Sequence, residues 1–237
     1  MVVDRNAEQQ KIEEVIAAIE QEYPDLIDGR LSTQELRQTI TKPIIGAYTV
    51  IGHEPSGPSN SFQNDPNKFQ IGEGSIWDSF GHITTKVKIG RMTHLSRYVD
   101  LGGGVEHQIV LGDGCGVAVQ TCIYTASDTI GDPFTIAPRS FHIKKGLHGD
   151  VILDNHVGVG ALSFVMPRNH ILEGDFITAL SVVPYDFQGF EPWCIYGGVG
   201  KNFHKIRNYR PEEVESELRK YECMEHLLNI AKQLKGE

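Results

Sequence analysis

The chain has 237 residues, 40% of them hydrophobic, and a formal net charge of −9 at pH 7. Its length is enough for one sizeable core, and its acidity argues against a general nucleic-acid binder. It begins with a polar stretch and contains no run of about twenty apolar residues, so we expect neither a signal peptide nor membrane insertion.

The N-terminal part of the chain, residues 1–68, is expected to be a helical and loop extension. Residues 8–22 place their apolar side chains on one stripe, which predicts a helix. Residues 41–51 are a candidate strand. Residues 52–68 are rich in Pro, Ser, Asn and Gly, a composition typical of a loop.

A six-residue period dominates the middle of the chain. An aliphatic or aromatic residue returns at every sixth position in three runs, and a fixed period is the sequence signature of a repeat fold. The positions are Ile71, Trp77, Ile83, Ile89, Leu95, Leu101, Leu111, Val117, Ile123, Leu153, Val159, Val165, Ile171, Ile177 and Val183.

The residues between these positions indicate the shape of the repeat. Period two would indicate half-buried strands and period 3.6 a helix, whereas six residues fit one short flat face followed by a tight corner. Three such faces make one coil of about eighteen residues in a parallel β-helix. The fourth residue after each apolar position is usually small or β-branched: Ser75, Val87, Thr93, Val99, Cys115, Thr121, Val157, Ser163 and Ser181.

Two interruptions of the period are candidates for function. The β-helix domain is expected over residues 69–186, with excursions near 102–110 and 126–150, where the period slips or fades. Long loops that break a regular scaffold commonly carry function. Residues 187–237 are expected to form a tail and a last helix that begins near Pro211, a favoured first helical position.

The cysteines indicate the redox environment. Cys115, Cys122, Cys194 and Cys223 form no CxxC pair and no disulfide-like framework. Because Cys115 and Cys122 lie within the repeat, we expect buried free thiols and a reducing, cytoplasmic location.

The C-terminal part of the repeat carries motifs that resemble those of the hexapeptide-repeat acyltransferases. The resemblance covers residues 71–210 as repeats and residues 120–210 in detail, although the tail lacks the usual Pro-Ala and the Gly-His-Pro of galactoside-type enzymes is absent. The matching elements are Gly158-Val159-Gly160-Ala161, Ala179-Leu180-Ser181-Val182-Val183 and the tail residues Lys201, Ile206 and Arg207.

The resemblance implies a mainly β fold: a left-handed parallel β-helix, here with N-terminal and C-terminal helices. It also implies homotrimers that bind the co-substrate acetyl-CoA between adjacent subunits. The segments Tyr124–Asp128 and Trp193–Gly197 look most like sugar and nucleotide-sugar O- or N-acetyltransferases of polysaccharide biosynthesis. The implied reaction is direct transfer of an acetyl group to a sugar hydroxyl or amine, without a covalent enzyme intermediate.

Three residues are candidates for the chemistry of this reaction. The acceptor must lose a proton, and histidine suits this task because its ordinary pKa is about 6.5. We expect His156, at a coil corner, as the first candidate and His107, at the end of a glycine-rich excursion, as the second. Asp128 is expected to hold an acceptor hydroxyl or amine, or to assist a histidine. Purely structural roles at a corner, a loop and a turn stay open for all three residues.

The residues expected at the acetyl-CoA site come from the same resemblance. Gly160, Ala161 and Ala179 match family positions that line the pantetheine groove, where small side chains permit close approach. Lys201, Lys205 and Arg207 form part of a basic cluster that suits the phosphates of CoA. Simple corner packing and a solvated basic face are the competing interpretations.

Two other functions stay open. Hexapeptide β-helices include a γ-class carbonic anhydrase with three histidine zinc ligands, and this chain has ten histidines, although no residues are predicted here as metal ligands. A β-helix can also serve as a non-catalytic scaffold. The favoured hypothesis is an acetyl-CoA-dependent sugar acetyltransferase with a small-molecule acceptor.

Overall fold

The computed structural model describes residues 5–27, 36, 39, 41–51, 62–127 and 146–236. The chain divides into two compact units. One unit is Lys42–Tyr209, and the other combines Met1–Thr41 with Arg210–Glu237.

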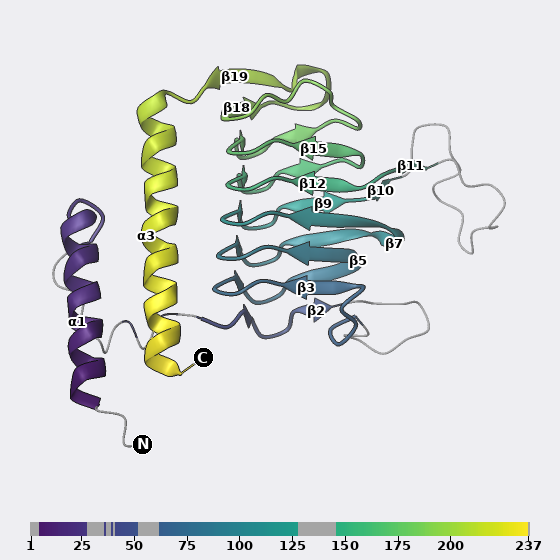
Figure 1. Ribbon diagram of the computed structural model, residues 1–237. Coiled ribbons are helices and arrows are strands. Elements are labelled where there is room, and N and C mark those ends of the chain that lie inside the picture. Colours follow the sequence, from purple (N-terminus) through teal and green to yellow (C-terminus); the bar gives the residue numbers. More distant parts are fainter. Residues whose placement is uncertain are drawn as a thin grey trace. The chain divides into compact units, whose positions relative to one another are not determined.

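The unit Lys42–Tyr209 is a β-solenoid whose coils stack along one axis (Figure 1). Its strands form three faces of parallel strands, with one strand per coil on each face. Trp77 pairs with Leu95 and Val159 with Ile177, so adjacent regular coils are offset by eighteen residues. The prediction of a parallel β-helix is therefore confirmed.

The first face contains β1 (Ile44–Ile45), β4 (Ile76–Trp77), β6 (His94–Leu95), β8 (Gly116–Val117), β13 (Gly158–Val159), β16 (Phe176–Ile177) and β18 (Cys194–Gly197). The second face contains β2 (Val50–Ile51), the first part of β5 (His82–Ile89), the first part of β7 (Asp100–Leu111), β9 (Cys122–Tyr124), β14 (Phe164–Val165) and β17 (Val182–Val183). The third face contains β3 (Phe69–Ile71), the last parts of β5 and β7, β12 (Val151–Leu153) and β15 (Asn169–Ile171).

The core contains the residues that the six-residue period identifies. Every one of these side chains is buried except that of Ile71, which is half-buried and packs against the same cluster. The small and β-branched residues four positions later are buried as well. Their hydroxyls bond to corner carbonyls, as Ser75 does to Gly90 at 2.7 Å and Thr93 to Gly112 at 2.9 Å. Buried polar groups with such partners cost little stability.

The corners require unusual backbone conformations. Large residues with positive φ line the corner between the first and second faces, and most of them are strongly exposed. Bulky residues rarely adopt this conformation, because it crowds the side chain against the backbone. We call the following column the apolar edge: Tyr48, Phe80, Tyr98, Leu162 and Leu180.

The solenoid is interrupted repeatedly at one corner, between the second and third faces, which we call the excursion corner. A bulge interrupts β7 there, and one coil later β10 (Ala126–Ser127) and β11 (Leu147–His148) leave the stack as an antiparallel ribbon (Figure 1). The chain also leaves the second face there after β17. Beyond that point η1 (Gly200–Asn202) precedes β19 (His204–Asn208), which pairs antiparallel with β18 and ends the first face.

The second unit contains two helices, α1 (Arg5–Glu22) and α3 (Pro211–Lys235), as predicted near both ends. Their apolar faces share one cluster, which includes Ile16, Ile19 and Cys223. An ion pair of 2.8 Å joins Arg219 to Asp25. Neither helix, and no other helix in the described ranges, is long and apolar enough to cross a bilayer.

Candidate active site

His107 lies in a bulge that the neighbouring coil holds in place. Ile83 pairs with Leu101 and Lys86 with Gln108, so the offset between the strands rises from 18 to 22 residues and the bulge takes up four extra residues of β7. The buried Thr85 hydroxyl lies 2.7 Å from the carbonyl oxygen of Gly104 and 3.0 Å from that of His107. Gly104 has φ of 86°, a region that favours glycine. The predicted excursion near 102–110 is thus a fixed part of the sheet.

The imidazole of His107 pairs with the carboxylate of Asp150 on the next coil. The distance from Nδ1 to Oδ1 is 3.1 Å. The His107 side chain is 34% exposed and that of Asp150 is 41% exposed. The backbone N–H of Gln108 donates to the same carboxylate oxygen at 3.2 Å. A carboxylate at Nδ1 orients the ring and leaves Nε2 as the proton-accepting atom. This arrangement can perform general base chemistry.

The ring of His148 also lies beside this pair. It stacks on His107 with ring centroids 6.2 Å apart, and it comes from β11, the returning strand of the ribbon. The ribbon and the bulge therefore place two imidazoles and one carboxylate at the excursion corner.

His156 occupies a different corner, between the third and first faces. Its φ is 60°, and its backbone N–H donates to the carbonyl oxygen of Asp113 in the preceding coil. Its ring stacks on Trp193 with centroids 6.0 Å apart. Within one chain, His156 and His107 are consequently not brought together. Asp128, the third catalytic candidate, lies outside the described residues, one position beyond the end of β10.

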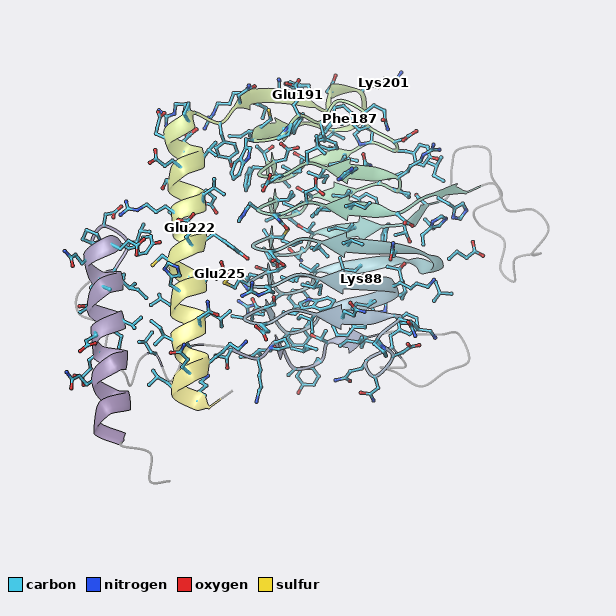
Figure 2. All side chains as sticks on the ribbon, in the orientation of Figure 1. Lys88, Phe187, Glu191, Lys201, Glu222 and Glu225 are labelled. Carbon is cyan, nitrogen blue, oxygen red and sulfur yellow. The ribbon has the colours of Figure 1, made fainter. Side chains whose placement is uncertain are left out.

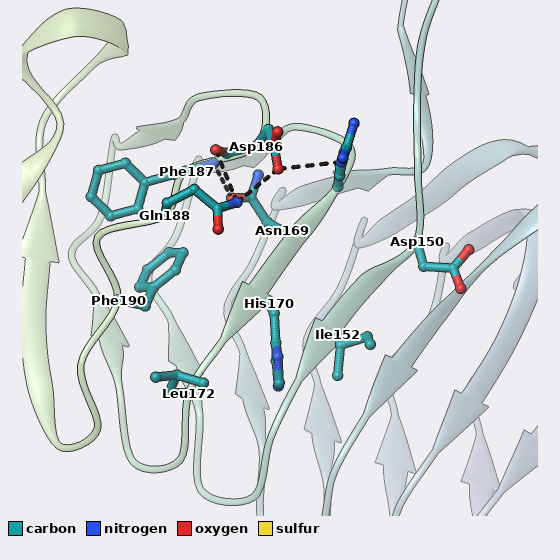
Figure 3. Close-up of a pocket in the computed structure, with 10 residues that line it drawn as sticks. Asp150, Ile152, Asn169, His170, Leu172, Asp186, Phe187, Gln188 and Phe190 are labelled. Carbon is teal, nitrogen blue, oxygen red and sulfur yellow. Dashed lines mark hydrogen bonds and ion pairs between the residues drawn. The ribbon is translucent and has the colours of Figure 1, made fainter.

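A groove of about 460 Å³ runs from the excursion corner over the third face (Figure 3). Ile152, His170 and Leu172 form its floor, and Phe187 and Phe190 form a wall that comes from the chain after β17. The remaining lining residues are Asp150, Arg168, Asn169, Asp186 and Gln188. Asp150 is thus shared between the groove and the His107 pair.

Buried and charged contacts fix the wall of this groove. The amide of Asn169, which is 2% exposed, donates to the carbonyl oxygen of Pro184 at 2.9 Å and accepts from the N–H of Phe187 at 3.1 Å. Arg168 forms an ion pair with Asp186, with Nε 3.3 Å from Oδ1. The groove is therefore largely preformed, as most small-molecule sites are.

The small residues expected at the acetyl-CoA site lie at the corner of the apolar edge. A side chain at Gly160 would collide with the backbone of Ala179, so this position permits the close approach of two coils. The N–H of Gly160 donates to the carbonyl oxygen of Ile177, and its own carbonyl accepts from Thr121. Ala161 is half-buried and Ala179 is exposed. Ala161 directly precedes Leu162 and Ala179 directly precedes Leu180, so both alanines adjoin the apolar edge.

The basic residues of the predicted cluster lie at the C-terminal end of the solenoid, where Figure 2 shows Lys201 and Glu191. Lys205 forms an ion pair of 2.8 Å with Glu191, and this contact raises the pKa of Lys205. The guanidinium of Arg207 stacks on Tyr209 at 5.6 Å from the ring centroid. Lys201 is exposed in η1.

Asp150 and His148 are the site residues that the sequence interpretation did not select. Asp150 directly precedes β12, where the six-residue period resumes, so its position beside the excursion was the available signal. Within the described ranges, no group of three or more His, Cys, Asp or Glu side chains is arranged to hold a metal ion.

Comparisons with solved structures show similarity to an N-acyltransferase. No family model and no curated protein matches the chain. The chain is similar to AntD, an N-acyltransferase from Bacillus cereus, in its complex with dTDP and 3-hydroxybutyryl-CoA: the TM-score is 0.59, the identity is 26%, and the match covers 84% of this chain and 100% of AntD.

Two AntD variants give the same result. One, bound to dTDP-4-amino-4,6-dideoxyglucose and coenzyme A, matches with a TM-score of 0.61 and 26% identity, over 81% of this chain and 96% of AntD. Another, bound to dTDP and coenzyme A, matches with a TM-score of 0.60 and 26% identity, over 81% of this chain and 97% of AntD. The similarity to hexapeptide-repeat acyltransferases that the sequence motifs indicate is thereby confirmed.

Proposed function

We propose that this protein transfers an acyl group from a CoA thioester to the amine of a nucleotide-linked amino sugar. The observation that carries the proposal is the match to almost the whole length of AntD, an N-acyltransferase bound to dTDP and CoA ligands. The His107–Asp150 pair supplies a candidate general base at a partly exposed site. A sugar hydroxyl is the alternative acceptor group.

The proposed reaction proceeds in one transfer step. The neutral amine attacks the thioester carbonyl carbon, an N–C bond forms, and the C–S bond breaks. His107 Nε2 takes the proton that the amine nitrogen loses, and this proton then goes to the departing thiolate, which leaves as free CoA. Asp150 stabilises the imidazolium that exists between the two proton transfers. No covalent enzyme intermediate is needed.

We propose His107 rather than His156 as the base, because the carboxylate of Asp150 orients the His107 ring. The ring of His156 packs on Trp193 at another corner. Asp128 directly follows β10 in the sequence, and we propose it as an acceptor contact.

Acetyl-CoA is the proposed donor, with longer acyl-CoA thioesters as alternatives, because AntD is bound to 3-hydroxybutyryl-CoA in one complex. We propose that the pantetheine arm lies along Ala161 and Ala179, beside Gly160. Lys201, Lys205 and Arg207 at the C-terminal end of the solenoid are proposed to contact the phosphates of CoA.

A homotrimer is the proposed assembly, with the apolar edge as part of the contact between copies. The side chains of this edge are between 43% and 79% exposed, and Tyr48, Phe80 and Tyr98 stack ring on ring along it. Gln120 lies between Tyr98 and Leu162 at the same corner, and exposed apolar side chains gathered in this way mark an interaction site.

The activity is tested by measuring free thiol released from acetyl-CoA and 3-hydroxybutyryl-CoA in the presence of nucleotide-linked amino sugars, with dTDP-4-amino-4,6-dideoxyglucose as the first acceptor. Acceptor-dependent thiol release and an N-acylated product in the mass spectrum are expected. Release of thiol without any acylated sugar, or no release with any acceptor, contradicts the proposal. Bound zinc without an effect of acyl-CoA would instead support the carbonic anhydrase alternative, and no thermal stabilisation by CoA would support a scaffold.

A further inference from the structure

We infer that the groove over the third face binds the sugar ring of the acceptor, with the amine directed toward Asp150. The inference rests on the proposed function and adds where the acceptor lies in relation to His107. It follows from the groove's position, its surface chemistry and its charge.

The position of the groove links it to the proposed base. Asp150 lines one end of the groove, and the same carboxylate accepts from His107 Nδ1 at 3.1 Å. A group held against this end of the groove therefore lies beside the imidazole. Asp150 thus links the groove to the proposed base, which must come within hydrogen-bond reach of the proton that it removes.

The surface chemistry of the groove suits a sugar ring. Ile152 and Leu172 offer apolar surface on the floor, and Phe190 offers an aromatic wall for the C–H faces of the ring (Figure 3). His170, Asp186 and Gln188 supply polar atoms along the same space for hydroxyl groups. Sites for small ligands combine apolar surface with a few placed polar groups in this way, and the volume of about 460 Å³ is of the usual size.

The charge of the groove distinguishes between the parts of a nucleotide-linked sugar. Its lining contains two carboxylates, Asp150 and Asp186, and one guanidinium, Arg168, which is paired with Asp186. His170 also faces a carboxylate, since its Nε2 lies 2.8 Å from Asp154. Such a lining favours an amine and disfavours a diphosphate. The nucleotide is consequently expected to lie outside the groove.

The test places a bulky ring in the groove and the same ring elsewhere on the same face. Ile152→Trp narrows the groove from its floor. Lys88→Trp is the matched control, because Lys88 pairs with Val110 and Val110 with Ile152, which puts it two coils away on the third face. Gln188→Trp, at an exposed position of the wall, is a second blocking variant that does not alter the solenoid.

Two measurements decide the outcome: the KM for each substrate, and the Kd of dTDP-4-amino-4,6-dideoxyglucose by calorimetry in the presence of coenzyme A. Both blocking variants are expected to raise the acceptor KM and Kd by about tenfold or more, with the acyl-CoA KM and all Lys88→Trp values within about twofold of wild type. If the folded blocking variants turn over with an unchanged acceptor KM and Kd, the assignment of the groove is overturned, while the proposed function stands. A wild-type protein that acylates no amino sugar overturns the proposed function, and this assignment with it.

Discussion

His107 and Asp150 are 43 residues apart in the sequence, and their side chains meet at 3.1 Å because they lie on successive coils. The bulge of β7 brings the imidazole to the excursion corner, and the carboxylate lies where the chain re-enters the solenoid before β12. The pairing therefore depends on both interruptions of the repeat.

Removing either member of this pair should slow acyl transfer. We expect His107→Ala to lower kcat by about 10²–10⁴, the usual contribution of a positioned base. Asp150→Asn should also lower kcat, because an amide orients the His107 ring less firmly and no longer stabilises the imidazolium that forms during transfer. Steady-state assays across pH measure both effects.

His156→Ala is the matched control for this prediction. It removes an imidazole from another corner of the coil, so kcat should stay within about threefold of wild type. A large loss of kcat in His156→Ala, with full turnover in His107→Ala, would reverse the assignment of the base.

Loss of the Thr85 hydroxyl should disturb the bulge. Thr85→Val keeps the volume of the side chain but removes the contacts to the carbonyl oxygens of Gly104 and His107. We expect the free energy of unfolding to fall by about 1–3 kcal/mol and kcat to fall as well, since the base loses its support. Thr93→Val removes an equally buried hydroxyl that contacts Gly112 in a regular coil, and it should lower stability without lowering kcat. Equal kcat in the two variants would show that Thr85 does not position His107.

The stability of the protein should depend on pH through Asp175, which is fully buried in the core of the solenoid. Burial raises the pKa of this carboxyl to about 7, although the backbone N–H groups of Cys194 and Leu172 oppose the shift. Because the folded pKa lies above the unfolded value, its stabilising contribution is fully present below about pH 4 and is lost as the pH rises through about 7.

The comparison with Asp175→Asn isolates this effect from all other titrating groups. The stability of the variant relative to wild type should increase between pH 5 and pH 8, by an amount on the order of a few kcal/mol. Urea unfolding at several pH values measures the difference. A difference that stays constant over this range would mean that Asp175 keeps an ordinary pKa in the folded protein.

A charge on the apolar edge should disrupt the proposed homotrimer. Leu180 is 67% exposed with φ of 60°, so Leu180→Asp adds a carboxylate without disturbing the core. We expect the sedimentation coefficient to change from that of a trimer to that of a monomer. Ile44→Asp changes an exposed apolar residue on the first face and should leave the trimer intact. An unchanged mass for Leu180→Asp would exclude this edge from the contact between copies.

The fold could be predicted almost completely from the sequence because each coil repeats the same chemistry. Apolar residues such as Leu101 and Val159 recur at every sixth position, and a coil with flat sides brings all of these side chains to its interior. Both residues are indeed in the core. The same period placed His156 at a corner, where the structure has it.

The site was less predictable because it depends on contacts between coils of unequal length. Val117 pairs with Val159, 42 residues later, instead of the 18 residues of a regular coil. The partner of His107 therefore could not be found by counting along the repeat. Asp150 was overlooked for this reason, and so was the groove, whose wall is formed by residues that follow the last period.

The position of the excursion corner has a consequence for how such a protein diversifies. The bulge, the ribbon and the groove wall all leave the solenoid between the second and third faces, whereas the inward side chains of neighbouring coils keep their register. If the groove holds the acceptor as proposed, insertions and deletions at this corner alter acceptor choice, while the stability that comes from coil-to-coil stacking changes little. Related enzymes with different sugar preferences should differ in length mainly here, and exchanging these segments between them offers a route to new specificity on an unaltered scaffold.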